Sequence, residues 1–135
     1  MDTLYREEIL EHYKDPQNFG ELDHCDISAR QTNPFCGDDI EMFVKFKRQK
    51  ASTPLSQKII DEIGFTGRGC AISIASASIL TEFAKGKTKN ELTKMTEDDM
   101  LGLLNIEVSE TRKKCALLAF AVLKDCLGDS ETSSE

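Results

Sequence analysis

Five cysteines are the side chains of this sequence with the most distinctive chemistry. They are Cys25, Cys36, Cys70, Cys115 and Cys126. An odd number of cysteines argues against a framework of disulfide bonds. Each cysteine is therefore expected to be a core residue, a metal ligand or a reactive thiol.

Three of these cysteines and one aspartate form a candidate metal site. Cys36 lies in a polar turn with Asp38, and Gly37 between them permits a tight backbone. Cys70 follows Gly67-Arg-Gly69 where a strand pattern changes to a helical one, and Cys115 lies in the first turns of the last predicted helix. Side chains at the ends of elements can converge from distant segments. Three thiolates and one carboxylate would suit Zn²⁺ or anchor an iron–sulfur cluster.

Local positive charge favours the thiolate form of two of these cysteines. Arg68 and a helix N-terminus lie beside Cys70, and Cys115 follows Arg112-Lys-Lys114. The spacing itself is less specific, because the intervals of 34 and 45 residues contain no CxxC pair. Burial as a small hydrophobic side chain therefore stays open as an alternative, above all for Cys115 on the apolar stripe of its helix.

The other two cysteines and both histidines are predicted to lie outside the site. Cys126 comes 11 residues after Cys115 on the same helix, which places it about 16 Å further along the axis, in the core. His24 and Cys25 could form a ligand pair, but a surface turn is the preferred interpretation. His12 is expected to be a packed or capping residue.

Hydrophobic periodicity predicts the elements that must position these residues. A helix is expected over residues 3–14, and short strands around residues 27–29, 40–46 and 59–66. Helices are expected over 70–85, 88–95, 96–104 and 109–127, with a capping box at Thr96-Glu-Asp-Asp99. Strands in series followed by helices predict an α+β fold, with an antiparallel meander and helices packed on one face of a small sheet.

The 135 residues predict one domain over residues 1–128 and a disordered acidic tail over residues 129–135. The net charge is −7, so nucleic acid and anionic membranes are not the expected partners. No apolar run is long enough for a membrane span, and no signal or transit peptide is recognised. A cytoplasmic location is therefore expected.

Four motifs together resemble the IscU/SufU/NifU N-terminal family of iron–sulfur cluster assembly scaffolds. They are an entry segment over residues 5–20, Asn33-Pro-Phe-Cys-Gly-Asp38, Phe65-Thr-Gly-Arg-Gly-Cys-Ala-Ile-Ser73 and Arg112-Lys-Lys-Cys-Ala116. The resemblance covers nearly the whole chain and implies a three-stranded antiparallel sheet. It also implies that Cys36, Asp38, Cys70 and Cys115 form the metal and cluster site.

The resemblance further implies an assembly function. Such scaffolds accept sulfur from a cysteine desulfurase, assemble a 2Fe-2S cluster with iron and pass it to recipient apoproteins. The candidate sulfur acceptors are Cys36, Cys70 and Cys115, and Zn²⁺ is the expected resting metal. The chain is then a scaffold and not an enzyme, unless it acts as a sulfurtransferase.

Two departures bear on the subfamily. IscU has a histidine where this chain has Lys114, and it carries a proline-rich chaperone segment where this chain has residues 105–111 without proline. Both departures resemble SufU, and they argue against a histidine ligand and against recognition by an Hsp70-type chaperone. SufU-type chains usually carry an insertion, however, and the 44 residues between Cys70 and Cys115 are too few to include it.

Other functions stay open at this point. One is a zinc-dependent acceptor that carries sulfur on a cysteine to another protein, and another is a structural zinc-binding module. A metallohydrolase is less favoured, because no general base accompanies the ligands as it does in HExxH. The run from Lys85 to Lys89 could meet an acidic partner, but a solvated helix end is the preferred interpretation.

Overall fold

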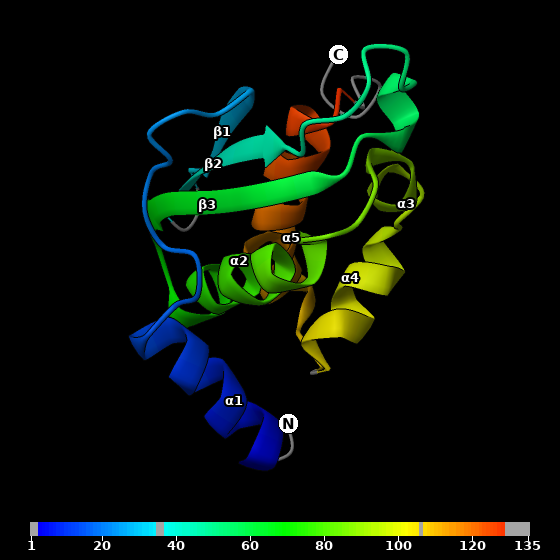
Figure 1. Cartoon of the computed structure of the whole chain (residues 1–135). Coiled ribbons are helices and arrows are strands. Elements are labelled where there is room, and N and C mark those ends of the chain that lie inside the picture. Colours follow the sequence, from blue (N-terminus) through cyan, green and yellow to red (C-terminus); the bar gives the residue numbers. More distant parts are fainter. Residues whose placement is uncertain (1–2, 35–36, 106, 129–135) are drawn as a thin grey trace.

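The computed structural model describes residues 3–34, 37–105 and 107–128. The elements in chain order are α1 (Thr3–Lys14), β1 (Ile27–Asn33), β2 (Asp38–Phe46), the short 3₁₀ helix η1 (Leu55–Gln57), β3 (Ile60–Arg68), α2 (Ala71–Ala84), α3 (Lys89–Thr93), α4 (Glu97–Leu104) and α5 (Glu110–Cys126). Figure 1 shows their arrangement. Cys36 and the predicted tail lie outside the described residues.

The three strands form one antiparallel sheet in the order β1-β2-β3, as the sequence predicts. The alternation in β2 places Ile40, Met42 and Val44 on one face, and all three are fully buried. The register pairs Met42 with Ala29 on one side and with Phe65 on the other. A β-bulge lies between Lys45 and Phe46, where the register shifts.

Helices α2 and α5 pack on one face of this sheet, which confirms the predicted α+β architecture (Figure 1). Small side chains on α2, among them Ala75, Ala77 and Ser76, have no exposed surface and allow this helix to approach its neighbours closely. The core between the layers is apolar, and its largest fully buried side chains include Phe65, Leu80 and Leu123. Among the described helices, none is long and apolar enough to span a membrane.

The helix starts follow from their capping residues. Thr96 accepts a hydrogen bond from the Asp99 backbone, and the Asp99 carboxylate accepts one from the Thr96 backbone, so the predicted capping box is confirmed. Thr88 and Glu91 form a second capping box at α3. Ser109 caps α5 by accepting from the Arg112 N–H. These caps satisfy backbone N–H groups that lack partners within each helix.

Two strands are longer than their hydrophobic patterns predict. β1 continues from Ala29 to Asn33, and β3 continues from Thr66 to Arg68. The reason is tertiary, because β2 supplies backbone partners as far as the pairs Asn33–Asp38 and Asp39–Arg68. The extra residues bring the start of β2 beside the start of α2.

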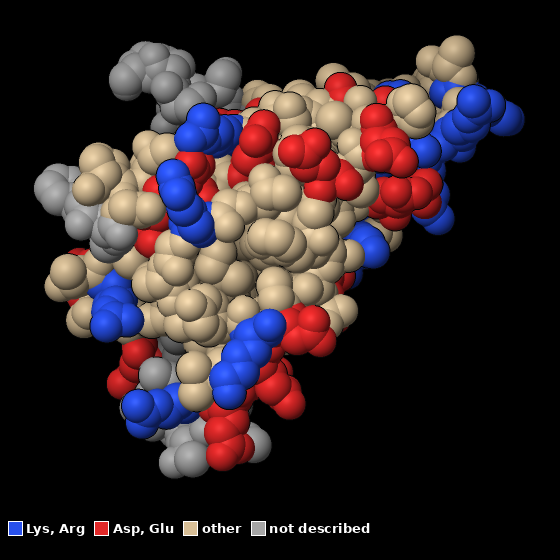
Figure 2. All heavy atoms as spheres, turned by 90° about the vertical axis from the view of Figure 1, so that its left-hand side faces the viewer, with Lys and Arg blue, Asp and Glu red and all other residues tan. Residues whose placement is uncertain are grey.

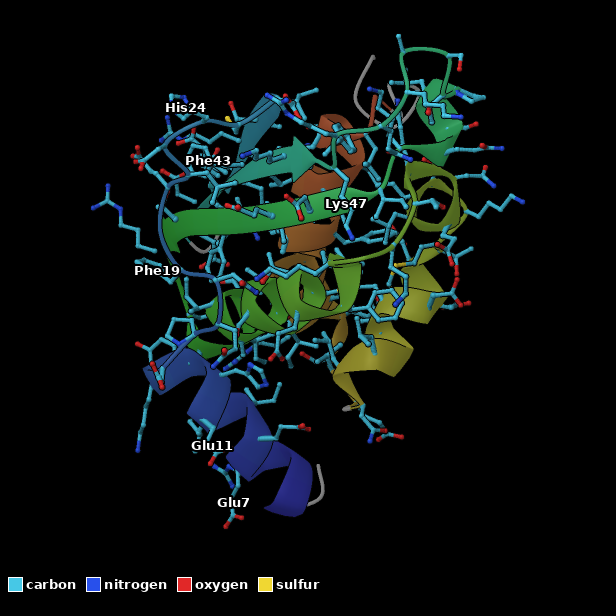
Figure 3. The ribbon with its side chains drawn as sticks, in the orientation of Figure 1. Glu7, Glu11, Phe19, His24, Phe43 and Lys47 are labelled. Carbon is cyan, nitrogen blue, oxygen red and sulfur yellow. The ribbon has the colours of Figure 1, made fainter. Side chains whose placement is uncertain are left out.

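Helix α1 packs on α2 and not on the sheet (Figure 1). Ile9 is buried there, and His12 Nδ1 lies 2.7 Å from the hydroxyl of Ser78, so His12 is a packed residue as predicted. Figure 3 shows Glu7 and Glu11 pointing away from α2, which agrees with the predicted amphipathic helix.

The segment after α1 runs along the outer edge of β3. The Phe65 N–H donates to the carbonyl of Asn18, and the Gly20 N–H donates to the carbonyl of Phe65. The ring of Phe19 is half exposed, and its edge meets the ring of Phe65 at a centroid distance of 5.2 Å. Figure 2 shows this side of the molecule, where charged side chains of both signs surround a largely uncharged area.

Candidate metal centre

Three of the predicted ligands meet where β2 and α2 begin and α5 completes its second turn. The carboxylate of Asp38 and the thiols of Cys70 and Cys115 have ligand atoms within 4.8 Å of one another. The chain itself brings them together from three elements: β2, the N-cap of α2 and α5. Cys36, the fourth predicted ligand, lies outside the described residues.

Asp38 is buried at 1% exposure and holds the turn that carries Cys70. Its Oδ1 accepts a hydrogen bond of 3.0 Å from the backbone N–H of Cys70. Its Oδ2 is also buried and has no hydrogen-bond partner among the described residues. An unpaired buried carboxylate oxygen is unfavourable unless a cation or a donor satisfies it. A metal ion held by the neighbouring thiolates would supply that cation, so the donor set fits a thiolate-rich Zn²⁺ or iron site.

Position 69 requires glycine, because neighbouring side-chain atoms leave no space for a Cβ in this turn. A Cβ on Gly69 would overlap Asp38 Oδ1 and Ser73 Oγ. The backbone before it is equally tight, since a Cβ on Gly67 would overlap the carbonyl oxygen of Asp39. The two glycines therefore let β3 turn directly into α2 while Asp38 stays within reach of Cys70.

The two described thiols differ in accessibility. Cys70 is half-buried and stands at the N-cap of α2, where its side chain makes no capping hydrogen bond. Cys115 is only 2% exposed and lies on the core-facing side of α5. From the sequence, Cys115 could be either a core residue or a metal ligand. In the structure its thiol is buried and also lies close to the ligand atoms of Asp38 and Cys70.

The remaining candidates lie away from this cluster or at its margin. Lys114 is exposed and directly precedes Cys115. Cys25 is an exposed free thiol, and Cys126 is buried in the core with its Sγ 3.9 Å from the carbonyl of Met42. Burial raises the pKa of the Cys126 thiol to about 12, and the nearby charge of Asp125 adds to this shift.

Sequence reasoning missed Ser73. This fully buried residue donates a hydrogen bond of 3.0 Å to the carbonyl of Cys70, and its oxygen lies 3.9 Å from the Cys70 sulfur. Its position three residues after a cysteine in the first turn of a helix could have indicated it, because residues three apart share a helix face.

The fold and this cluster of carboxylate and thiols define an α+β domain with a candidate metal site. Residues 4–134 match the family described as the NifU-like N terminal domain, and the chain therefore belongs to this family. The resemblance inferred from the four sequence motifs is thereby confirmed.

Relatives with known names agree with this assignment. The chain is 34% identical to the zinc-dependent sulfurtransferase SufU of Bacillus subtilis, over 97% of this chain and 94% of the relative. It is 28% identical to the iron–sulfur cluster assembly scaffold protein IscU of Escherichia coli, over 97% of both chains. These relatives make it a member of the iron–sulfur cluster assembly scaffold family.

A solved structure shows the same fold. The crystal structure of an iron–sulfur cluster assembly scaffold protein for the SUF system, from Fervidobacterium islandicum AW-1, superposes with a TM-score of 0.72 at 26% identity. The match covers 90% of this chain and 94% of that chain.

Proposed function

We propose that this protein accepts sulfur from a cysteine desulfurase, assembles a 2Fe-2S cluster with iron and passes the cluster to recipient apoproteins. The observation that carries the proposal is the convergence of Asp38, Cys70 and Cys115 around a buried carboxylate oxygen without a hydrogen-bond partner among the described residues. Cys36 is the proposed fourth ligand on the basis of its sequence position alone. Three thiolates supply the sulfur ligation that iron–sulfur clusters require.

Sulfur transfer needs a thiolate that the donor can reach. In the proposed step a thiolate of this chain attacks the outer sulfur of the donor's persulfide, a new S–S bond forms, and the donor's cysteine leaves as a thiolate. Of the two described site thiols, Cys70 is half-buried and Cys115 is almost fully buried. We therefore assign the first sulfur-accepting role among these two to Cys70.

Asp38 is the proposed exchangeable ligand. A hard carboxylate binds iron and zinc less strongly than a thiolate does, so it is the ligand that most readily gives up its place. Asp38 lies at the first residue of β2, beside the turn of Gly37, where the backbone has a positive φ of 72°. A scaffold must release its cargo, and one weak ligand at the start of the central strand serves that need.

A zinc-dependent sulfurtransferase is the second candidate function. Two observations favour it: Lys114 directly precedes Cys115, in the place of the histidine of IscU, and SufU of Bacillus subtilis is a relative at 34% identity. In this version Zn²⁺ is the resting metal that the same ligands hold, and a site cysteine carries the sulfur. Either chemistry needs reduced thiols, so we place the protein in the reducing cytoplasm.

Anaerobic reconstitution tests the proposal. The purified protein is incubated with ferrous iron, cysteine, a cysteine desulfurase and a thiol reductant, which supplies the electrons that convert persulfide sulfur to sulfide. The visible absorption of a cluster is followed before transfer to an apo-ferredoxin. We expect the parent to form and transfer a cluster, the Cys70→Ala variant to form none, and the control Cys25→Ser to match the parent.

The same preparation separates the alternatives. A colourless protein with one zinc ion that accelerates desulfurase turnover would support the sulfurtransferase instead. A zinc protein that neither forms a cluster nor affects the desulfurase would contradict both functions and leave a structural zinc module.

A further inference from the structure

Ser73 lies beside the candidate site, and the proposed function gives it no role there. It is fully buried in the first turn of α2, three residues after Cys70. Its hydroxyl donates to the Cys70 carbonyl at 3.0 Å, and its oxygen lies 3.9 Å from the Cys70 sulfur, with the thiol as donor. Ser73 Oγ and Asp38 Oδ1 both lie against Cα of Gly69, since a single Cβ placed there would overlap both oxygens.

The hydrogen bond from Ser73 to the Cys70 carbonyl is replaceable. The same carbonyl also accepts a hydrogen bond of 3.2 Å from the backbone N–H of Ile74. If the Ser73 hydroxyl rotated away, the carbonyl would keep one partner, so the cost of rotation would be small. The hydroxyl proton is therefore available to a second acceptor within its reach.

Metal binding would create that acceptor. A thiol that binds a metal loses its proton to solvent, because the thiolate is the ligand. The contact from Cys70 to Ser73 would then have no hydrogen, and lone pairs of sulfur and oxygen would face each other. Rotation of the Ser73 hydroxyl toward sulfur removes this repulsion and replaces it with a hydrogen bond to an anion, which is stronger than one to a neutral group.

We propose that Ser73 is a positioning residue that turns its hydroxyl from the Cys70 carbonyl to the Cys70 sulfur when the thiolate binds metal. This inference rests on the proposed function, because it requires Cys70 to be a ligand. Hydrogen bonds to ligand sulfurs withdraw charge from them and tune the metal they hold. Ser73 thus partly neutralises a site whose other described ligands are a carboxylate and a thiol.

Cobalt substitution tests the inference on the full chain. Co²⁺ bound by thiolates has a sulfur-to-metal charge-transfer band whose energy falls as the charge on sulfur rises. We expect Ser73→Ala to move this band to lower energy and to release Zn²⁺ to a chelator about 10-fold faster. A factor of about 10 is the lower end of the range for removing a residue that hydrogen-bonds to a metal ligand. Ser73→Thr keeps the hydroxyl and should restore the parental values.

Ser76→Ala is the matched control. Ser76 lies one turn further along α2, is equally buried, and its hydroxyl has no hydrogen-bond partner among the described residues. A purely structural effect of removing a buried hydroxyl would appear in both variants, whereas the band shift should appear only at position 73. Ser73→Ala is expected to fold, because alanine is the residue most favourable in a helix.

The outcomes separate this inference from the proposed function. A parent that binds Co²⁺ through Cys70, with an unshifted band in Ser73→Ala, overturns the role of Ser73 alone. A parent that binds no Co²⁺ through Cys70 overturns the proposed site and this inference with it. A shift in Ser73→Ala that Ser73→Thr reverses and Ser76→Ala lacks supports the inference.

Discussion

Asp38 combines two tasks in one side chain. Its Oδ1 holds the backbone N–H of Cys70, and its Oδ2 is buried with no partner among the described residues. The first task is structural and persists without metal. The second has a physical rationale only when a cation is present, because burial of an unpaired carboxylate oxygen is unfavourable.

The Asp38→Ala variant tests its role as the exchangeable ligand. We expect it to bind metal or cluster still, with water or Lys114 at the vacant position, and to release it more slowly than the parent. The measurement is zinc release to a chelator and cluster transfer to an apo-ferredoxin. Asp39→Asn is the control, since Asp39 is engaged with Arg30 and lies next along β2. If Asp38→Ala releases zinc and transfers the cluster at the parental rates, Asp38 is only a turn residue.

The cysteines outside the cluster give a second prediction at this scale. Cys25→Ser and Cys126→Ala should both keep the parental metal stoichiometry, because neither thiol belongs to the group formed by Asp38, Cys70 and Cys115. Cys126→Ala should lower the free energy of unfolding by about 1 kcal/mol through a small cavity. Metal analysis of the folded variants decides the matter, and metal loss from either one would refute this assignment.

Cys126 also predicts how stability depends on pH. Its pKa is about 12 in the folded chain and 9.0 in the reference state, so the unfolded chain loses this proton first as pH rises. Stability should therefore fall progressively between pH 9 and 12. Urea unfolding at pH 8 and 10.5 should show a smaller loss in Cys126→Ala than in the parent. An equal loss in both proteins would assign the effect to other groups.

The connection between β3 and α2 is the element on which the site depends. It has no room for a side chain at position 69, because Asp38 Oδ1 and Ser73 Oγ occupy that space. The helix that follows is long and well packed, so a disturbed connection should alter the site before it unfolds the domain.

Gly69→Ala should therefore lower metal affinity with little change in helix content. The added Cβ forces Asp38 or Ser73 away and breaks the hydrogen bond to the Cys70 N–H. Gly102→Ala in α4 is the matched control, because its Cβ would meet nothing within 4 Å and should stabilise the helix by about 0.5–1 kcal/mol. Metal titration and circular dichroism of both variants provide the measurement. Parental affinity in Gly69→Ala would show that the turn adapts.

On the scale of the whole molecule, the site ties together segments that are distant in sequence. Asp38 begins β2, Cys70 stands at the N-cap position of α2 and Cys115 belongs to α5, so one bound ion would link the sheet to both helices that cover it. Such an ion would bind the folded chain in preference to the unfolded one, in which these residues are far apart. It therefore stabilises the fold by mass action.

Removal of the metal should therefore lower the melting temperature. At a free metal concentration 1,000 times the Kd, the stabilisation amounts to about 4 kcal/mol. Thermal unfolding before and after chelation gives the measurement, with metal loss confirmed by analysis. The Cys70→Ala variant should melt at the same temperature with and without chelator. An unchanged parental melting curve would contradict a site built across these segments.

Local patterns in the sequence were sufficient for the elements. Alternation predicted the core face of β2, and the capping box at Thr96 predicted the start of α4, because both depend on residues close together in the chain. The grouping of Asp38, Cys70 and Cys115 is not local in this sense, and its prediction came from their positions at the ends of elements and from the family resemblance. The role of Cys36 stays a prediction from the sequence.

Tertiary contacts decided the rest. The ends of β1 and β3 depend on partners in β2, and the hydrogen bond from the Cys70 N–H to Asp38 joins residues 32 positions apart. Tertiary contacts also determine the packing of α1 on α2 and the position of Ser73 beside the Cys70 sulfur. Periodicity reports which face of an element is apolar but not which surface covers it, so only the folded chain determines which groups share a site.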